Sequence, residues 1–567
     1  MKDRFTIKFG GYSGQGINTL GGFLSKALKN SGYFTFAYRE YPSVIKGGYA
    51  SFQIDFASHF ISSSTTKTKI LACISDESLD KYTQTVTKDG VILHSLKEYT
   101  FSKENTEYIK ENSIVVKYID TEALAQECNA PPIMGNIIML GAVWSLLKLN
   151  RKVLEKEVVE YFSKKKGIDI EAEKRCLSAG YQNIKDIKVK GLPEKIKKGW
   201  ENSKILTGNQ AIALGAIAGG CRAYFAYPMT PATSILETLG DTYEETGIIV
   251  KQAESEITAI QMAMGSMYMG ARAFTATSGG GFDLMTETIS CSGMTEIPLV
   301  IVLGQRAGSG TGVPTFSGSS DLDAALQAGH GEFPRCVLAA SDAIDSYELI
   351  QEAFNISETY QIPVILLTEK QISESLFNIL ELPTPLKIQR GLTSKGTKRY
   401  LLTKDGISPR WLPKKGQKTY LSNSDEHDEH GISTEDIEDI KSMAQKRIRK
   451  SIKLEKSIPH PKYYGPKDPT IVFVGMGSTK NAVLDAMKVN KKRIGYLHYK
   501  YIFPLKEEKI LELNKKGTQI VLIENNLVGA FGKLIKEQSG IYIPNTLNKF
   551  DGRPFFVDDI LEYIKNR

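Results

Sequence analysis

Residues 223–231 read Ala-Tyr-Phe-Ala-Tyr-Pro-Met-Thr-Pro, which is a short apolar strand followed directly by a proline-rich turn. The same alternation of apolar strands with segments of helical spacing continues downstream. Further strands are expected at 248–252, 272–277, 299–304 and 362–367. Continuous apolar strands between helices are typical of a parallel sheet that is covered on both faces. Residues 205–385 are therefore predicted to form one α/β domain.

Three further segments flank this domain. Residues 1–190 also have an α/β pattern, with a strand at 5–9, a glycine-rich loop at 10–16 and a helix at 17–29. That loop could bind a phosphate or could serve only close packing, and its spacing matches neither the dinucleotide nor the P-loop pattern. Residues 386–465 are charged and poor in regular pattern. Residues 466–567 are again α/β, so the prediction is a multidomain α/β protein.

Composition limits the class of protein. The chain has 567 residues, 41% hydrophobic and 24% charged, which predicts a globular protein of two to four domains. A net charge of +8 with scattered lysines does not favour nucleic-acid binding. The N-terminus lacks a signal peptide, and the uncharged run at 128–147 is better explained as a buried helix than as a membrane span. We expect a cytoplasmic protein without membrane association.

Metal sites have little support in the sequence. The six cysteines never approach the Cys-x-x-Cys spacing of zinc sites and iron–sulfur clusters. His427 and His430 could ligate a metal, but histidines in a polar loop are more often solvated. We therefore expect no metal site on this chain.

A hydroxyl, a carboxylate and a guanidinium side chain each follow one of the predicted strands. Thr230 comes after the first strand, Glu256 after the second and Arg306 after the fourth. A loop of small residues, Ser278-Gly279-Gly280-Gly281, follows the strand at 272–277. Ligands of an open parallel sheet bind beyond the carboxyl ends of the strands, so these residues are expected to meet at one edge.

Each of the three has a structural alternative. Glu256 could simply favour a helix N-terminus, but the helix that it opens is too apolar for a surface helix, so we expect a desolvated carboxylate. Arg306 could bind a substrate carboxylate through two hydrogen bonds or could form an ordinary ion pair. Thr230 could donate a hydrogen bond to a substrate oxygen or cap a helix.

The sequence also lacks the Gly-Asp-Gly motif. Every Asp-Gly pair, at 89–90, 405–406 and 551–552, lacks the leading glycine of the Gly-Asp-Gly motif with which thiamine enzymes bind diphosphate and Mg²⁺. The chain can therefore supply only half of such an active site.

Taken together, these residues resemble the fused γα-type alpha subunit of 2-oxoacid:ferredoxin oxidoreductases over nearly the whole chain. Residues 10–16 and 42–48 resemble the γ domain of that family, with Lys46 where Arg is usual. Residues 227–231, 254–256, 275–282 and 305–306 resemble its pyrimidine-binding domain, and 466–567 its transketolase C-terminal-like domain. Gly280 and Ser309-Gly310 depart from the family pattern, which has a proline in each loop.

The resemblance implies roles for individual residues. Glu256, Thr230 and Arg306 would be catalytic, with Glu256 bonding the pyrimidine ring of thiamine diphosphate. The substrate would contact Tyr227, Pro228, Thr230 and Arg306. The cofactor would contact Pro228, Glu256, Ser278, Gly279 and Phe282.

It also implies partners. A separate β subunit would carry the diphosphate motif with Mg²⁺ and a 4Fe-4S cluster, ferredoxin would accept electrons, and coenzyme A would accept the acyl group. The assembly would be a heterodimer or a dimer of heterodimers. The favoured substrate is 2-oxoglutarate, with pyruvate and branched-chain 2-oxo acids as alternatives. A thiamine-dependent decarboxylase or transketolase without clusters, and a non-catalytic binding or scaffold subunit, are the competing hypotheses.

Overall fold

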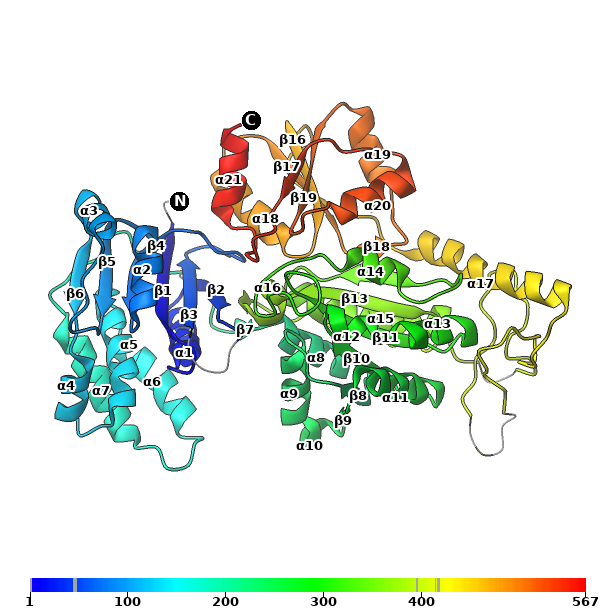
Figure 1. Ribbon diagram of the computed structural model, residues 1–567, viewed down its shortest axis with the longest axis horizontal. Coiled ribbons are helices and arrows are strands. Elements are labelled where there is room, and N and C mark those ends of the chain that lie inside the picture. The colour runs from blue at the N-terminus through cyan, green and yellow to red at the C-terminus, as the bar shows by residue number, and fades with distance from the viewer. Residues whose placement is uncertain (1–2, 44–47, 197, 394–395, 414, 416–418) are drawn as a thin grey trace. The chain divides into compact units, whose positions relative to one another are not determined.

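The computed structural model describes the chain except residues 1–2, 44–47, 197, 394–395, 414 and 416–418 (Figure 1). The chain divides into two compact units. Unit 1 comprises Met1–Leu206, Ser375–Glu381 and Phe556–Arg567, and unit 2 comprises Thr207–Glu374 and Leu382–Phe555. Phe556–Arg567 thus belongs to unit 1 rather than with the residues that precede it. The division into segments at 1–190, 205–385, 386–465 and 466–567 stays a prediction.

Unit 1 is built on an eight-stranded mixed sheet with the order β6-β5-β4-β1-β3-β2-β14-β7. Its strands are β1 Arg4–Tyr12, β2 Phe34–Glu40, β3 Tyr49–Ala57, β4 Thr68–Cys73, β5 Val86–His94, β6 Val115–Tyr118, β7 Lys204–Leu206 and β14 Leu376–Ile379. Its helices are α1 Ile17–Asn30, α2 Asp76–Tyr82, α3 Lys103–Glu111, α4 Thr121–Glu127, α5 Gly135–Leu146, α6 Arg151–Phe162, α7 Ile170–Asn183 and α21 Val557–Lys565, with short 3-10 turns at Thr83–Thr85 and Pro132–Met134.

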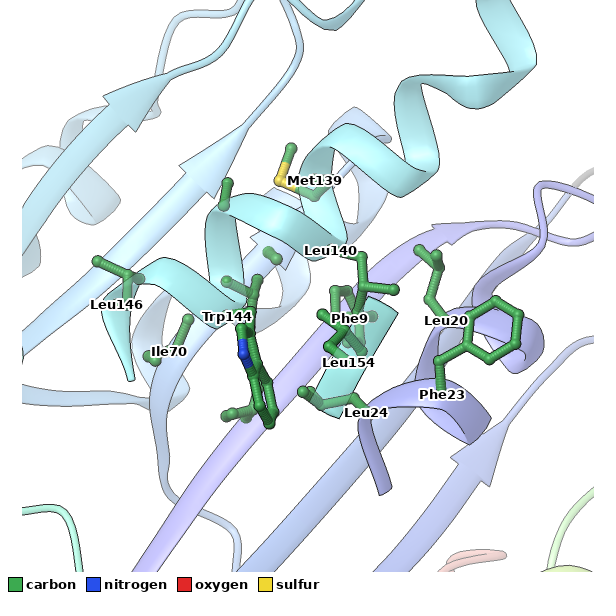
Figure 2. Close-up of a cluster of buried hydrophobic side chains, with 14 of the residues drawn as sticks. Phe9, Leu20, Phe23, Leu24, Ile70, Met139, Leu140, Trp144, Leu146 and Leu154 are labelled. Atoms are coloured by element: carbon green, nitrogen blue, oxygen red, sulfur yellow. The ribbon is translucent and has the colours of Figure 1, made fainter. Parts of the chain in front are cut away.

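The core of unit 1 lies between this sheet and helices α1, α5, α6 and α7. Figure 2 shows side chains of α1, α5 and α6 meeting those of β1 and β4, among them Phe9, Leu24, Ile70, Trp144 and Leu154. The uncharged run at 128–147 contains α5, whose residues are almost all buried. The prediction of a buried helix there is confirmed. No helix in the described part of the chain is long and apolar enough to cross a membrane.

The start of unit 1 differs from the prediction. Strand β1 continues through Gly10, Gly11 and Tyr12, because these residues pair with Ser51, Ala50 and Tyr49 of β3. A Cβ on Gly10 would lie 2.6 Å from the Cβ of Ser78, so close packing requires glycine there. Strand β2 was not predicted from the sequence. Lys46, which was singled out in the sequence, lies outside the described residues.

Unit 2 contains a seven-stranded sheet with the order β18-β12-β13-β11-β10-β8-β9. Its strands are β8 Ala223–Ala226, β9 Ile249–Gln252, β10 Ala273–Thr277, β11 Leu299–Gln305, β12 Cys336–Ala339, β13 Pro363–Glu369 and β18 Tyr501–Phe503. All neighbours are parallel except β12 and β18. The predicted parallel sheet is therefore confirmed, with β12 as a strand that the sequence did not reveal.

A five-stranded sheet, β15-β17-β16-β19-β20, completes unit 2. Its strands are β15 Lys462–Tyr464, β16 Ile471–Met476, β17 Ile494–Tyr499, β19 Gln519–Glu524 and β20 Thr546–Asn548. The helices of unit 2 are α8 Gly208–Ala218, α9 Thr233–Asp241, α10 Tyr243–Thr246, α11 Glu256–Tyr268, α12 Gly279–Asp283, α13 Thr286–Thr295, α14 Leu322–Gln327, α15 Ala343–Tyr360, α16 Lys370–Glu374, α17 Ile437–Ser457, α18 Thr479–Val489, α19 Glu508–Lys515 and α20 Ala530–Ser539.

The segment 386–465 corrects two expectations. It contains α17, a 21-residue helix, where little regular structure was expected. Charged residues, Lys446, Arg447 and Lys450, lie on its buried face, whereas isoleucines at helical spacing along it are exposed: Ile437, Ile440, Ile448 and Ile452. His427 is buried rather than solvated, because its ring packs on Tyr400 with centroids 4.0 Å apart. Among the described residues, no group of three or more His, Cys, Asp or Glu is arranged to hold a metal ion.

Candidate active site

The predicted site residues lie at one edge of the seven-stranded sheet in unit 2. Strands β11, β10, β8 and β9 are parallel neighbours, so their carboxyl ends lie side by side. Thr230 follows β8, Glu256 follows β9, Ser278 follows β10 and Arg306 follows β11. The end of β11 also contacts the loop after β8, since a Cβ on Gly304 would lie 3.2 Å from the Cγ of Pro231.

Arg306 is a buried cation. Its side chain is 7% exposed, and one terminal nitrogen donates to the carbonyl oxygen of Thr230 at 3.0 Å. No carboxylate of a described residue lies within 4.0 Å of the guanidinium. Burial lowers the pKa of Arg306, and the more distant Asp321 partly offsets this, but a guanidinium stays charged at neutral pH. The ordinary ion pair is therefore not the arrangement found, and the charge is available to an anionic ligand.

Glu256 opens α11 but does not cap it. The side chain of Ser255 accepts the capping hydrogen bond from the Thr258 N–H at 3.3 Å. Glu256 is 5% exposed and has no hydrogen-bond partner among the residues that the structure describes. The helix buries Ala259, Ile260 and Ala263 but exposes Ile257, so the expectation that α11 is no surface helix is wrong, although Glu256 itself is buried. A buried carboxylate without a partner is costly unless a ligand satisfies it.

The loop after β10 lies directly against Glu256. A Cβ on Gly281 would lie 2.6 Å from a carboxylate oxygen of Glu256 and 2.1 Å from the Thr277 hydroxyl, so glycine is required there. Ser278 is fully buried, and its hydroxyl has no hydrogen-bond partner in the described part of the chain. The loop thus presents one unsatisfied hydroxyl and little side-chain bulk beside an unsatisfied carboxylate.

The remaining predicted residues lie in different surroundings. Tyr227 is 41% exposed, and Pro228 is half-buried in the turn that leads to Thr230. Phe282 is buried in the hydrophobic core with Met285 and Leu303. The assignments of these residues to substrate and cofactor stay predictions.

Asp321 is a residue of this site that the sequence reasoning missed. It precedes α14, and a Cβ on Gly279 would lie 3.2 Å from its carboxylate. Its backbone N–H donates to the side-chain oxygen of Gln305 at 3.0 Å. In the sequence Asp321 looks like an ordinary helix-capping residue, and only the fold brings it to the loop after β10.

Comparisons with known proteins agree with this geometry. Residues 214–446 match the family model "Pyruvate flavodoxin/ferredoxin oxidoreductase, thiamine diP-bdg", and residues 6–183 match "Pyruvate ferredoxin/flavodoxin oxidoreductase". The 2-oxoacid:ferredoxin oxidoreductase subunit alpha of Saccharolobus solfataricus is 31% identical, over 99% of this chain and 97% of that protein. The chain belongs to the 2-oxoacid:ferredoxin oxidoreductase family.

Other members of the family extend the comparison. The alpha subunit from Sulfolobus sp is 30% identical over 99% of this chain and 96% of its own length. The 2-oxoglutarate synthase subunit KorA of Methanothermobacter marburgensis is 28% identical over 63% of this chain and 97% of that subunit. A solved 2-oxoglutarate:ferredoxin oxidoreductase from Magnetococcus marinus has a TM-score of 0.91 at 26% identity, covering 100% of both chains.

The two loops that depart from the family's proline pattern meet in space. A Cβ on Gly280 would lie 4.0 Å from the carbonyl oxygen of Gly310. Gly310 has a φ of 59°, a backbone conformation that favours glycine. The departures therefore affect one place in the site, between the loops after β10 and β11.

The residues present fit the pyrimidine half of thiamine diphosphate. Glu256 and Ser278 are buried polar groups without a hydrogen-bond partner among the described residues, and the absence of a side chain at Gly281 lets the loop after β10 pack closely against Glu256. The sequence contains no Gly-Asp-Gly motif for the diphosphate half.

Proposed function

We propose that this chain is the alpha subunit of a thiamine diphosphate-dependent 2-oxoacid:ferredoxin oxidoreductase, with 2-oxoglutarate as the favoured substrate. The reaction converts the 2-oxo acid and coenzyme A to an acyl-CoA and CO₂ and reduces ferredoxin. Membership of the family supports the reaction type. The Magnetococcus enzyme, which was solved with 2-oxoglutarate, coenzyme A and succinyl-CoA, supports the choice of substrate. Pyruvate and branched-chain 2-oxo acids remain the alternatives.

The buried guanidinium of Arg306 is the observation that carries the proposal. A cation that is 7% exposed and lacks a close carboxylate partner is costly unless an anion binds to it. A 2-oxo acid offers a planar carboxylate, which Arg can hold through two parallel hydrogen bonds. The Thr230 carbonyl fixes one nitrogen, so the remaining donors of the guanidinium are left for the substrate.

Glu256 would act on the cofactor and Thr230 on the substrate. When bound, thiamine diphosphate supplies the carbanion chemistry that breaks the bond between C1 and C2 of a 2-oxo acid. Glu256 would hold a proton at the pyrimidine ring nitrogen, and its buried position keeps water from competing for that proton. Tyr227, Pro228 and the Thr230 hydroxyl would contact the substrate.

The second half of the site would come from a β subunit. That subunit would carry the diphosphate motif with Mg²⁺ and the 4Fe-4S cluster, and it would pass electrons to ferredoxin. Exposed apolar side chains on the described elements around the site, Tyr227, Ile257 and Leu284, are a suitable contact surface for it. We propose a heterodimer or a dimer of heterodimers, with 205–385 as the pyrimidine-binding domain and 466–567 as the transketolase C-terminal-like domain.

The chain should be inert by itself. It lacks the diphosphate motif and cluster-type cysteine spacing, so activity requires the partner. Expressed singly, it should neither oxidise 2-oxo acids with a viologen dye nor show a cluster absorption band. Co-expressed with the β subunit, it should do both. Activity of the single chain would contradict the proposal, and an inactive complex that binds neither cofactor nor 2-oxo acid would favour a scaffold role.

A further inference from the structure

The chain after Arg306 folds back onto the residue that follows it. Residues 315–318 are buried, although the function proposed above gives them no role. The N–H of Ala307 donates to the carbonyl oxygen of Phe316 at 3.3 Å, and a Cβ on Gly318 would lie 2.9 Å from the Cα of Ala307. The buried segment 315–318 thus packs directly beside the carboxyl end of β11.

Ser319 follows this buried segment and is held by the turn after β19. Its N–H donates to the carbonyl oxygen of Asn525 at 2.9 Å, and its own carbonyl oxygen accepts a hydrogen bond from the side-chain amide of Asn526 at 3.1 Å. Both asparagines are buried. The same amide of Asn526 also donates to the buried carboxylate of Glu524 at 2.7 Å, which fixes its orientation. Both backbone groups of Ser319 are therefore bonded to the five-stranded sheet.

The turn after β20 holds the buried segment at a second place. The N–H of Ser317 donates to the carbonyl oxygen of Gly552 at 3.0 Å. The guanidinium of Arg553 lies over the ring of Phe316, 4.2 Å from its centre. A Cβ on Gly552 would lie 3.3 Å from the Cβ of Phe316 and 3.9 Å from that of Ala307. This turn therefore contacts the residue that directly follows the buried guanidinium of the candidate site.

We propose that Asn525, Asn526 and Gly552 are positioning residues for Arg306. The side-chain amide of Asn525 donates to the carbonyl oxygen of Arg553 at 3.0 Å, so the two turns are bonded to each other and form one support for the loop. They act through the backbone that follows Arg306 and not on the reacting atoms. The five-stranded sheet thus takes part in the site of the seven-stranded sheet. The inference rests on the proposed function, because it assumes that Arg306 binds a 2-oxo acid.

The geometry of the proposed contact explains why this support matters. A guanidinium holds a carboxylate through two parallel hydrogen bonds, which require the two planar groups to be aligned. A misplacement of about 1 Å, caused by a change far from the reacting atoms, can cost about 10²-fold in rate. The carbonyl oxygen of Thr230 fixes one nitrogen of Arg306 at 3.0 Å, and the position of the backbone decides where the other donors point. Disturbing the support should therefore raise the KM for the 2-oxo acid.

Two glycines in the same part of unit 2 allow a matched test. Gly552 and Gly540 both have left-handed backbones, with φ of 78° and 73°, so alanine strains the chain at either position. A methyl group on Gly552 would press on Phe316, whereas no described residue beyond its chain neighbours lies within 4 Å of one on Gly540. In the αβ complex, Gly552→Ala should raise the KM for 2-oxoglutarate about three- to tenfold, and Gly540→Ala should leave it unchanged. Titration with thiamine diphosphate should give the wild-type affinity for both variants.

A double-mutant cycle separates positioning from a general loss of stability. In a chain that already carries Arg306→Lys, Gly552→Ala should raise KM by less than about twofold, because the aligned contact is already lost. Equal KM values for Gly552→Ala and Gly540→Ala, or effects of Gly552→Ala and Arg306→Lys that multiply, would overturn the inference and leave the proposed function intact. An unchanged KM in Arg306→Lys alone would instead overturn the proposed carboxylate contact, and the inference with it. If Gly552→Ala failed to fold, Phe316→Leu, which removes the ring beside Arg553, would decide by the same cycle.

Discussion

At the scale of single residues, the candidate site is marked by charged side chains that are buried without a close partner among the described residues. Arg306 and Glu256 are 7% and 5% exposed, and neither has an ion-pair partner among the described residues. Leaving such groups unsatisfied costs stability. In the proposed function, the carboxylate of a 2-oxo acid would satisfy Arg306, and the pyrimidine ring of thiamine diphosphate would satisfy Glu256.

Arg306→Lys should weaken substrate binding although it keeps the charge. Lysine is a point charge and cannot make the planar double contact that a carboxylate accepts from arginine. A hydrogen bond to a charged group contributes about 1.5–3 kcal/mol, so we expect KM to rise about tenfold or more. The exposed Arg222→Lys is the matched control and should leave KM unchanged.

Thr230→Val tests the second proposed substrate contact, the hydroxyl of Thr230. It removes one hydroxyl and no charge, so it should raise KM less than Arg306→Lys. Steady-state assays of the αβ complex over a range of 2-oxo acid concentrations would measure both effects. An unchanged KM in Arg306→Lys together with lost turnover in Thr230→Val would show that the carboxylate contact is wrongly assigned.

The sequence predicted part of this site and missed part. Thr230, Glu256 and Arg306 each follow an apolar strand, and the parallel order of the strands makes their convergence predictable. Asp321 follows a long loop rather than a strand, so no pattern connects it with the other three. Its pKa, raised to about 6, arises from burial and from Asp283, which are properties of the fold alone.

At the scale of elements, α17 shows where periodicity fails. Its buried face carries Lys446 and Lys450, whose ammonium groups pair with the fully buried Glu296 at the end of α13. The isoleucines of α17 recur at helical spacing but are exposed, so the usual rule that the apolar side of a helix is buried fails for it. Helix α5 was predicted because its burial follows from its uncharged composition, whereas α11, which has a similar composition, is buried on one side only.

Glu296→Gln should strongly destabilise unit 2. It leaves two buried ammonium groups without their carboxylate, and breaking a buried ion pair costs about 3–5 kcal/mol. Differential scanning calorimetry should show a transition lowered by several degrees. Glu455→Gln on the exposed face of α17 removes the same charge and should leave the transition in place. An unchanged transition in Glu296→Gln would mean that α17 is held by packing alone.

At the scale of the whole molecule, the chain divides into two compact units, and the candidate site lies in unit 2. Repeated apolar strands predicted the α/β class, and the parallel sheet of unit 2 confirms it. Strand β14 and helix α21 belong to unit 1 although unit 2 residues precede both in the chain. The local sequence does not indicate to which unit such a segment belongs, because this is decided by packing against residues that are far away in the sequence.

The central claim is that Glu256 is the carboxylate that serves the cofactor in the αβ complex. Glu256→Gln should retain the fold and thiamine diphosphate but lose about 10²–10⁴-fold in kcat, because an amide cannot hold the proton. Glu254→Gln is the matched control, since Glu254 is exposed and bonds only Thr258 among the described residues. The most direct measurement is the rate of viologen reduction by the two variants with saturating 2-oxo acid and coenzyme A. We expect near-normal turnover for Glu254→Gln and almost none for Glu256→Gln, whereas activity of Glu256→Gln within about threefold of wild type would contradict the role of Glu256.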